Sequence, residues 1–349
     1  MLVSELDTPA LTVDLNVLER NIRNMAEHCR NLDIALRVHT KTHKVPEIAH
    51  MQLAAGASGI TCQKLGEAEV MCEAGTRDIL IPYNIVGKPK LERLTRLVKR
   101  ATITVAVDSE ATARGLSEQA REDDCTIRVI IELDTGGHRC GVQSPEAALE
   151  LAKKIVALPG LDFQGIMTYP SSLRVKPFIE RTVELLTGEG IPVNLISGGG
   201  TGAEAISKEI GCTETRSGSY IFEGMTRVSV SRHMGLNPQR CALRMIVTVV
   251  SVPTSDRIIM DAGQKAFASY PPTPYGYVIE HPEIKITGMS VEHGHIDVSA
   301  SSHPFKVGER LSVIPLHQGM TTNLHDELIG VREDKVEVIW KVAGRGKVK

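Results

Sequence analysis

The feature that most constrains this chain is the regular alternation of short β-branched runs with longer segments of helical period. Between about residues 14 and 235, apolar residues in the longer segments recur at steps of three and four, as in the predicted helices 15–29, 90–99 and 145–156. The short runs predict eight strands, at 34–38, 58–62, 78–81, 103–106, 127–133, 163–167, 193–196 and 213–216. This rhythm predicts a (β/α)8 TIM-type barrel, with a doubly wound open sheet as the alternative.

After about residue 240 the pattern changes to strands without intervening helices. The predicted strands are 245–252, 257–260, 284–289, 295–299, 309–314, 327–332 and 335–340. Turn residues lie between several of them, as expected for a mostly antiparallel sheet. We therefore expect a barrel domain over 1–240 and a C-terminal β domain over 241–349. Residues 1–14 contain a further strand-like run that could pair with the β domain.

Composition and charge argue against several classes of protein. The formal net charge of −2 disfavours a nucleic-acid partner, which needs a concentrated basic surface. No run approaches 18 apolar residues and the first residues do not resemble a signal peptide, so we expect no membrane span and no export. The seven cysteines are scattered and never spaced as CxxC, which favours reduced thiols. We therefore expect a cytoplasmic protein.

In a barrel of this kind, catalytic residues belong at the C-terminal ends of the strands. The first strand runs into a cluster of two histidines and two lysines, His39, Lys41, His43 and Lys44. Lys41 is the candidate nucleophile, because an amine held beside other cations has a lowered pKa and readily forms imines with carbonyl compounds. Lys44 and Lys64 are rival candidates, and most lysines are simply solvated. His39 and His43 could act as bases or only cap the loop.

Two later turns supply candidate ligand-binding groups. After the seventh strand, the segment 197–202 holds three consecutive glycines, whose backbone N–H groups can approach a phosphate closely. Barrels frequently build the phosphate site from the loops after strands seven and eight, so this position favours a phosphate site over a merely flexible loop. After the fifth strand, Arg139 follows a Gly-Gly turn, which suggests a ligand-facing role. Arg227 and Arg232 are further candidates for the neighbourhood of the pocket.

These segments resemble the family of D-threonine aldolases and eukaryotic-type D-serine dehydratases, which are pyridoxal-phosphate (PLP) enzymes with an alanine-racemase-like barrel. The matching segments are 37–44 (RVHTKTHK), 61–71 (TCQKLGEAEVM), 132–142 (ELDTGGHRCGV), 197–201 (SGGGT) and 216–222 (RSGSYIF). The resemblance implies that Lys41 carries PLP as a Schiff base and that Arg139 contacts the cofactor ring. The cofactor-binding residues that it implies are Lys41, Gln63, Arg139, Gly199, Gly200, Thr201, Ser219 and Tyr220. It also implies a homodimer.

The family's metal motif, His-x-Cys (or Asp)-x-Thr-x-Asn, is only partly present. His317 keeps the first ligand position, but Gly319 stands at the second, and a glycine has no side chain to coordinate a cation. The family's aldolases also carry a histidine after strand six that serves as base, where this chain has Tyr169 and no histidine. We therefore expect His317 to be a hydrogen-bonding residue, and a divalent metal to be doubtful. Asp326 or His293 could complete a metal site from a new position.

Three functions are compatible with this sequence. The first is a lyase that cleaves or dehydrates a β-hydroxy-D-amino acid, with His39, His43, Tyr169 or the amine of Lys41 as base. The second is a metal-independent racemase or epimerase, favoured by the missing metal ligand. The third is a non-catalytic PLP-binding protein, against which the C-terminal β domain argues. Without PLP, the remaining alternative is a barrel enzyme that binds a phosphorylated metabolite. The sequence does not identify the amino acid.

Overall fold

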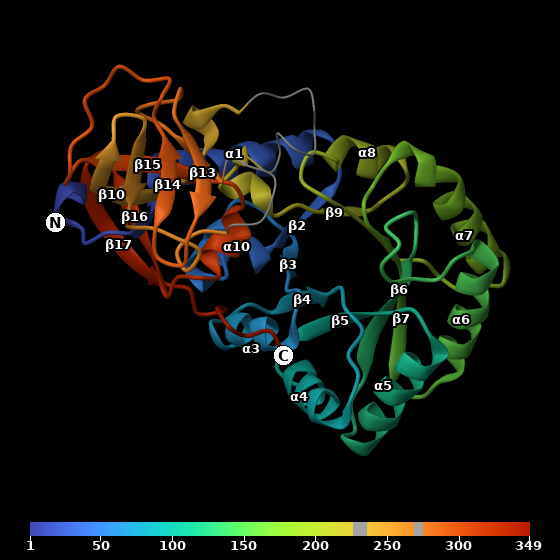
Figure 1. The fold of residues 1–349 in the computed structure, drawn as a ribbon. Helices are drawn as coiled ribbons and strands as arrows, with labels where there is room; N and C mark the ends of the chain where they lie inside the picture. Colours follow the sequence, from blue (N-terminus) through green and yellow to red (C-terminus); the bar gives the residue numbers. More distant parts are fainter. Residues whose placement is uncertain (226–235, 269–274) are drawn as a thin grey trace. The chain divides into compact units, whose positions relative to one another are not determined.

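The computed structural model describes residues 1–225, 236–268 and 275–349, and it contains the closed parallel barrel that the sequence predicts (Figure 1). The barrel strands are β2 (Ala35–His39), β3 (Gly59–Thr61), β4 (Asp78–Ile81), β5 (Thr102–Val107), β6 (Ile127–Leu133), β7 (Leu161–Thr168), β8 (Leu195–Gly199) and β9 (Glu214–Arg216). Pairing of β2 with both β3 and β9 closes the barrel, which excludes the open sheet. Arg227 and Arg232 lie outside the described residues.

Helices alternate with the strands along the chain, as the 3.6-residue period predicts. They are α1 (Leu15–Asn31), α2 (Pro46–Ala54), α3 (Leu65–Glu73), α4 (Lys88–Val98), α5 (Glu110–Glu122), α6 (Pro145–Ala157), α7 (Lys176–Gly188) and α8 (Glu204–Glu209). α5 and α6 each begin after a serine, Ser109 and Ser144, whose side chain accepts a backbone N–H of the first turn. Figure 1 shows α5, α6 and α7 on the outer face of the barrel.

The centre of the barrel is filled with side chains. Leu80, Ala106, Ile130 and Met167 form a buried apolar cluster contributed by four neighbouring strands.

Short 3-10 turns complete the secondary structure: η1 (Val3–Glu5), η2 (Thr40–Thr42), η3 (Leu173–Val175), η4 (Ser219–Ile221) and η5 (Pro238–Arg240). Among the residues that the structure describes, none of the helices has the length and hydropathy that crossing a membrane requires.

The remaining strands form a mixed, mostly antiparallel sheet. They are β1 (Ala10–Asp14), β10 (Leu243–Thr254), β11 (Arg257–Met260), β12 (Gly276–Val278), β13 (Lys285–Met289), β14 (Gly294–Asp297), β15 (Arg310–Pro315), β16 (Glu327–Arg332) and β17 (Lys335–Lys341). β1 lies inside this sheet, antiparallel to β10 and parallel to β16. β12 and the short helix α10 (Gln318–Thr322) were not predicted, because three and five residues contain few repeats of a period.

The described chain divides into two compact units that interleave along the sequence. One unit comprises Met1–Arg23, Thr42–Val45 and Ser219–Arg345, and the other comprises Asn24–Lys41, Pro46–Gly218 and Gly346–Lys349. The first unit contains the mixed sheet and the second contains the barrel strands. A division into domains at residue 240 therefore stays a prediction.

A partly buried ion-pair network lies where the barrel closes. Arg37 on β2 donates from Nε to Oε2 of Glu214 on β9, at 2.7 Å, and from Nη1 to Oδ1 of Asp78 on β4, at 2.6 Å. The Glu214 side chain is only 4% exposed, so its charge depends on these partners rather than on water.

We expect Arg37→Ala to lower the free energy of unfolding by about 3–5 kcal/mol, because removing one partner of a buried ion pair leaves the other charge uncompensated. Denaturant unfolding followed by circular dichroism measures the loss. Arg181→Ala is the matched control, since Arg181 pairs with Glu184 at the surface, and its unfolding curve should stay close to that of the wild type. Equal losses in the two variants would contradict the role given to Arg37.

Candidate active site

Lys41 lies immediately beyond β2, in the turn η2 at the C-terminal end of the barrel strands. Thr40 Oγ1 donates to the backbone carbonyl of Thr61 at 3.0 Å, which fixes this turn against β3. The Lys41 side chain is accessible to solvent, although protein atoms surround its amine. This burial lowers the pKa of its amine below 10.5, and the nearby charges of Arg139 and Arg216 lower it further. These effects favour the neutral amine, which is the form that acts as a nucleophile.

The two rival lysines have other contacts. Lys64 Nζ lies 3.8 Å from the centre of the Tyr83 ring, in a cation–π contact. Lys44 is buried and its Nζ donates to Asn323 Oδ1 at 2.7 Å. Of the three candidates, Lys41 combines accessibility with a lowered pKa.

His39, the last residue of β2, is buried beside Gln63. His39 Nε2 lies 3.2 Å from Gln63 Oε1, and Gln63 Nε2 donates to the carbonyl of Pro82 at 3.4 Å. Burial holds the pKa of His39 well below 6.5, with Lys41 and Arg216 adding to the effect. The imidazole is therefore neutral at physiological pH, and it links the turn after β2 to the turn after β3.

Arg139 is held by a buried carboxylate at the C-terminal ends of the barrel strands, which we call the open end of the barrel. Its Nη2 donates to Glu132 Oε1 on β6 at 3.1 Å, and Glu132 is 5% exposed whereas Arg139 is 53% exposed. Burial raises the pKa of Glu132, and the hydrogen bond and charge of Arg139 oppose that shift. The Arg139 guanidinium also lies 5.4 Å from the centre of the Tyr169 ring. Arg139 therefore presents a positioned cation to the open end.

Arg216, at the end of β9, is a site residue that the sequence analysis did not single out. Its buried guanidinium donates from Nη1 to Ser197 Oγ at 2.6 Å and from Nη2 to the carbonyl of Thr168 at 2.8 Å. Its charge contributes to the lowered pKa values of both Lys41 and His39. The available signal was a basic residue at the end of a buried strand.

The three glycines 198–200, at the end of β8 and directly after it, are required for different reasons. A Cβ on Gly198 would lie 2.7 Å from Cys212 Sγ and 2.8 Å from Ser171 Oγ, so packing alone excludes a side chain there. Gly200 has a φ of +116°, a conformation that side chains disfavour. The triplet is therefore explained in part by packing and in part by the shape of the turn.

Backbone N–H groups in this turn are partly engaged within the barrel. The N–H of Gly199 donates to Ser171 Oγ at 2.9 Å, so a phosphate bound there would share or replace that contact. Thr201 Oγ1 accepts the N–H of Gly218 at 3.1 Å, which joins the turns after β8 and β9. These are the two loops at which barrels usually build a phosphate site.

The predicted site residues fall in both compact units. Those at the C-terminal ends of the barrel strands are His39, Lys41, Gln63, Arg139, Tyr169, Gly199, Gly200 and Thr201. His43, Ser219, Tyr220 and His317 belong to the unit that contains the mixed sheet. His43 is fully buried, and its Nδ1 accepts the N–H of Val45 at 3.1 Å. Tyr220 is buried in the turn η4.

The partial metal motif has a structural role in this fold. His317 is the N-cap of α10, where its Nδ1 accepts the N–H of Met320 at 3.1 Å. Gly319, in the first turn of α10, offers no donor atom. Asp326 pairs with Arg345 at 2.9 Å. Among the described residues, no group of three or more potential His, Cys, Asp or Glu ligands includes His317 or either predicted substitute. At His317 the second position of the motif therefore holds no side-chain ligand.

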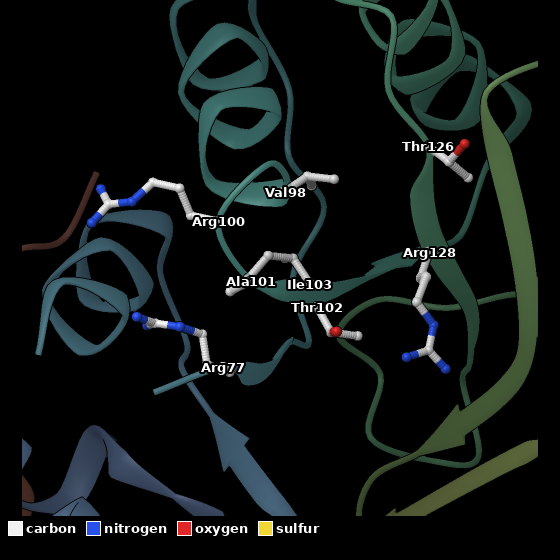
Figure 2. A pocket seen from close by; sticks show the side chains of 8 residues that line it. All are labelled: Arg77, Val98, Arg100, Ala101, Thr102, Ile103, Thr126 and Arg128. Carbon is white, nitrogen blue, oxygen red and sulfur yellow. The ribbon is translucent and has the colours of Figure 1, made fainter. Parts of the chain in front are cut away.

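A separate pocket of about 440 Å³ lies at the N-terminal ends of the barrel strands (Figure 2). It is lined by Arg77, Val98, Arg100, Ala101, Thr102, Ile103, Thr126 and Arg128. Figure 2 shows the guanidinium groups of Arg77 and Arg100 on one side of the segment 101–103 and that of Arg128 on the other, so they do not converge on one ligand. In barrel enzymes this end serves stability, so this pocket is not the candidate active site.

The chain matches two families of protein domains. The family described as alanine racemase, N-terminal domain, matches residues 13–225, and the serine dehydratase domain matches residues 242–331. Among curated proteins, D-threonine aldolase from Arthrobacter sp is 36% identical over 361 residues, which cover 99% of this chain and 94% of that protein. 3-Hydroxy-D-aspartate aldolase from Paracoccus denitrificans (strain Pd 1222) is 33% identical over 365 residues. This match covers 99% of this chain and 93% of that protein.

Solved structures share the same architecture. D-threonine aldolase from Filomicrobium marinum gives a TM-score of 0.91 at 33% identity, and the match covers 99% of this chain and 98% of that chain. A variant of D-threo-3-hydroxyaspartate dehydratase in a metal-free form gives 0.88 at 28% identity, with 98% of both chains covered. Alanine racemase from Clostridium difficile 630 shares the fold, with a TM-score of 0.71 at 16% identity.

We expect Arg139→Ala to shift the reactivity of Lys41 to higher pH. Removing this cation removes one of the causes that lower the amine's pKa, so a higher pH is needed to deprotonate it. The rate at which a carbonyl reagent modifies Lys41 is followed against pH by mass spectrometry, after bound carbonyl compounds have been removed. The control is Arg128→Ala, an arginine at the opposite ends of the strands. If the pH dependence of Lys41 modification is unchanged in Arg139→Ala, or shifts equally in both variants, Arg139 does not lower the pKa of Lys41.

Proposed function

This chain belongs to the family that joins an alanine racemase N-terminal domain to a serine dehydratase domain, and we propose that it is a PLP-dependent lyase acting on a β-hydroxy-D-amino acid. The observation that carries the proposal is the accessible amine of Lys41, with its lowered pKa, at the open end of the barrel. Aldol cleavage is the first candidate reaction and dehydration the second, because an aldolase and a dehydratase both match over nearly the whole chain.

The donors at the open end fit PLP chemically. Lys41 would hold the cofactor through its amine, and the Arg139 guanidinium would face the ring as a hydrogen-bond donor. The turn containing Gly200 and Thr201 would hold the phosphate with backbone N–H groups. Bound PLP supplies an electron sink for the α-carbon of an amino acid. The proposed cofactor-binding residues are Lys41, Gln63, Arg139, Gly199, Gly200, Thr201, Ser219 and Tyr220.

Burial separates the candidate bases into two groups. Lys41 Nζ and Tyr169 Oη belong to accessible side chains and can exchange protons with a substrate. His39 and His43 are buried, and the pKa of His39 lies far below the range in which it would take up a proton. We assign proton transfer to Lys41 or Tyr169, and positioning roles to the two histidines.

A second candidate function is amino-acid racemisation. The observation that favours it is Gly319, because exchange of the α-proton needs no metal whereas the family's lyase motif contains a second ligand at this position. Metal assistance through His317 is not part of our proposal. A homodimer is part of it, on the family resemblance alone.

Lys41→Ala should abolish the absorption band at about 420 nm that a PLP–lysine imine gives, and should lower kcat by at least about 10³-fold. Spectra are recorded with added PLP, and activity is measured on D-threonine, 3-hydroxy-D-aspartate and D-serine. Cleavage of D-threonine yields glycine and acetaldehyde, whereas dehydration yields an oxo acid and ammonia. α-Proton exchange in D₂O with neither product would favour the racemase.

Lys64→Ala is the matched control for this experiment. It removes a lysine from the neighbouring turn and should keep both the band and the activity. A band that disappears in Lys64→Ala and persists in Lys41→Ala would reassign the cofactor lysine. A wild-type protein that shows no band after PLP is added would overturn the proposed function.

Wild-type activity should be insensitive to EDTA, because Gly319 supplies no ligand. We expect Gly319→Asp, which introduces a carboxylate two residues after His317, to make turnover respond to added Mn²⁺ by about tenfold or more. Gly319→Ala controls for loss of the glycine itself and should stay indifferent to the metal. If EDTA abolishes wild-type turnover and Mn²⁺ restores it, the assignment of a metal-independent reaction is wrong.

A further inference from the structure

Three potential metal ligands converge in the compact unit that contains the mixed sheet, and none of them belongs to the proposed active site. His281 lies between β12 and β13, and His303 and Glu309 lie between β14 and β15. Their ligand atoms all lie within 4.8 Å of one another. Glu309 Oε1 is 2.8 Å from His303 Nε2 and 4.0 Å from His281 Nε2, so both imidazoles face one carboxylate oxygen.

These spacings suit a tetrahedral metal centre. With metal–donor distances of about 2.0–2.2 Å, neighbouring ligands of a tetrahedral Zn²⁺ site lie about 3.3 Å apart. The two separations from Glu309 Oε1 lie on either side of that value. The third separation, between the ligand nitrogens of the two histidines, is within 4.8 Å, so the three donors lie near the spacing of one tetrahedral centre.

Outer groups already orient two of the three ligands. His281 Nδ1 lies 3.4 Å from Glu283 Oε1, and Ser301 Oγ donates to the same Glu283 oxygen at 2.6 Å. A carboxylate behind the other ring nitrogen is the usual partner of a metal-bound histidine. The backbone N–H of Lys306 donates to Glu309 Oε2 at 3.1 Å, which leaves Oε1 to face the histidines.

Ring packing also restrains the two imidazoles. The ring centres of His281 and His303 are 4.5 Å apart, and the ring of Phe305 packs edge-on against both, at 4.9 Å and 4.7 Å. The side chains of His281 and Glu309 are 18% and 24% exposed, so the cluster is reachable by ions but partly shielded. The ligands are thus held near their positions before an ion arrives.

A simple ion pair at the surface explains this arrangement less completely than a metal site does. One histidine beside Glu309 would satisfy the carboxylate, and exposed pairs of this kind contribute little to stability. It leaves unexplained why a second imidazole faces the same oxygen and has a carboxylate of its own behind it. Both features are expected of a metal site.

We propose that His281, His303 and Glu309 bind a divalent cation of the Zn²⁺ type. Imidazole and carboxylate together are ligands typical of Zn²⁺, whereas Mg²⁺ and Ca²⁺ prefer oxygen ligands alone. The ion would tie the segment between β12 and β13 to the segment between β14 and β15. This site shares no residue with the motif at His317, and it does not depend on the proposed function.

The test is titration of the tag-free, PLP-loaded protein with ZnCl₂, followed by calorimetry and by thermal unfolding. We expect one high-affinity site per chain and a Tm raised by about 5 °C when free Zn²⁺ is about 100-fold above Kd. Co²⁺ as a substitute probe should give the visible absorption of a site with nitrogen and oxygen ligands.

Substitutions test whether Zn²⁺ binds at His281, His303 and Glu309. His303→Ala should abolish the high-affinity site, and Glu283→Gln, a subtler change behind His281, should raise Kd about tenfold. The matched controls are His295→Ala, which removes a nearby histidine that contacts Ser290, and His317→Ala. Both should bind Zn²⁺ as the wild type does. Absence of stoichiometric binding in the wild type, or binding that survives His303→Ala and is lost in His317→Ala, would overturn the proposal.

Discussion

One buried carboxylate, that of Glu214, links the strands at which the barrel closes. Glu214 accepts hydrogen bonds from Arg37 on β2 and from Ser197 on β8, and Ser197 in turn accepts one from Arg216. A buried charge is tolerated only when its partners are in place, so this network forms only when β2, β8 and β9 meet in register. The same network brings the buried charge of Arg216 to the open end, where it lowers the pKa of Lys41. Folding and reactivity thus share one set of contacts.

The sequence predicted the barrel and its strands well because both rest on periodicity, which is local. Four predicted strands have the observed bounds: Asp78–Ile81, Ile127–Leu133, Arg257–Met260 and Glu327–Arg332. The family resemblance inferred from five ordered segments is confirmed. β12 and α10, with three and five residues, repeat their period too few times to stand out in the sequence.

The site was predictable only where position along a strand decides the role. Lys41 and Arg139 follow strand ends and were identified in that way. The partnership of Arg139 with Glu132 and the burial of His43 depend on distances between segments that are remote in the sequence. The cluster of His281, His303 and Glu309 likewise follows no motif spacing. Its members are brought together by the connections between strands of the mixed sheet.

The place of β1 in the mixed sheet has a consequence for biosynthesis. β1 ends at Asp14, but its antiparallel partner β10 begins only at Leu243. At about 5–20 residues per second, a ribosome needs roughly 10–45 s to make the intervening chain. During that time the mostly apolar run Ala10–Val13 lacks both of its partner strands, β10 and β16, although the barrel segments are already emerging. The nascent chain therefore exposes an unpaired N-terminal strand until β10 has been made.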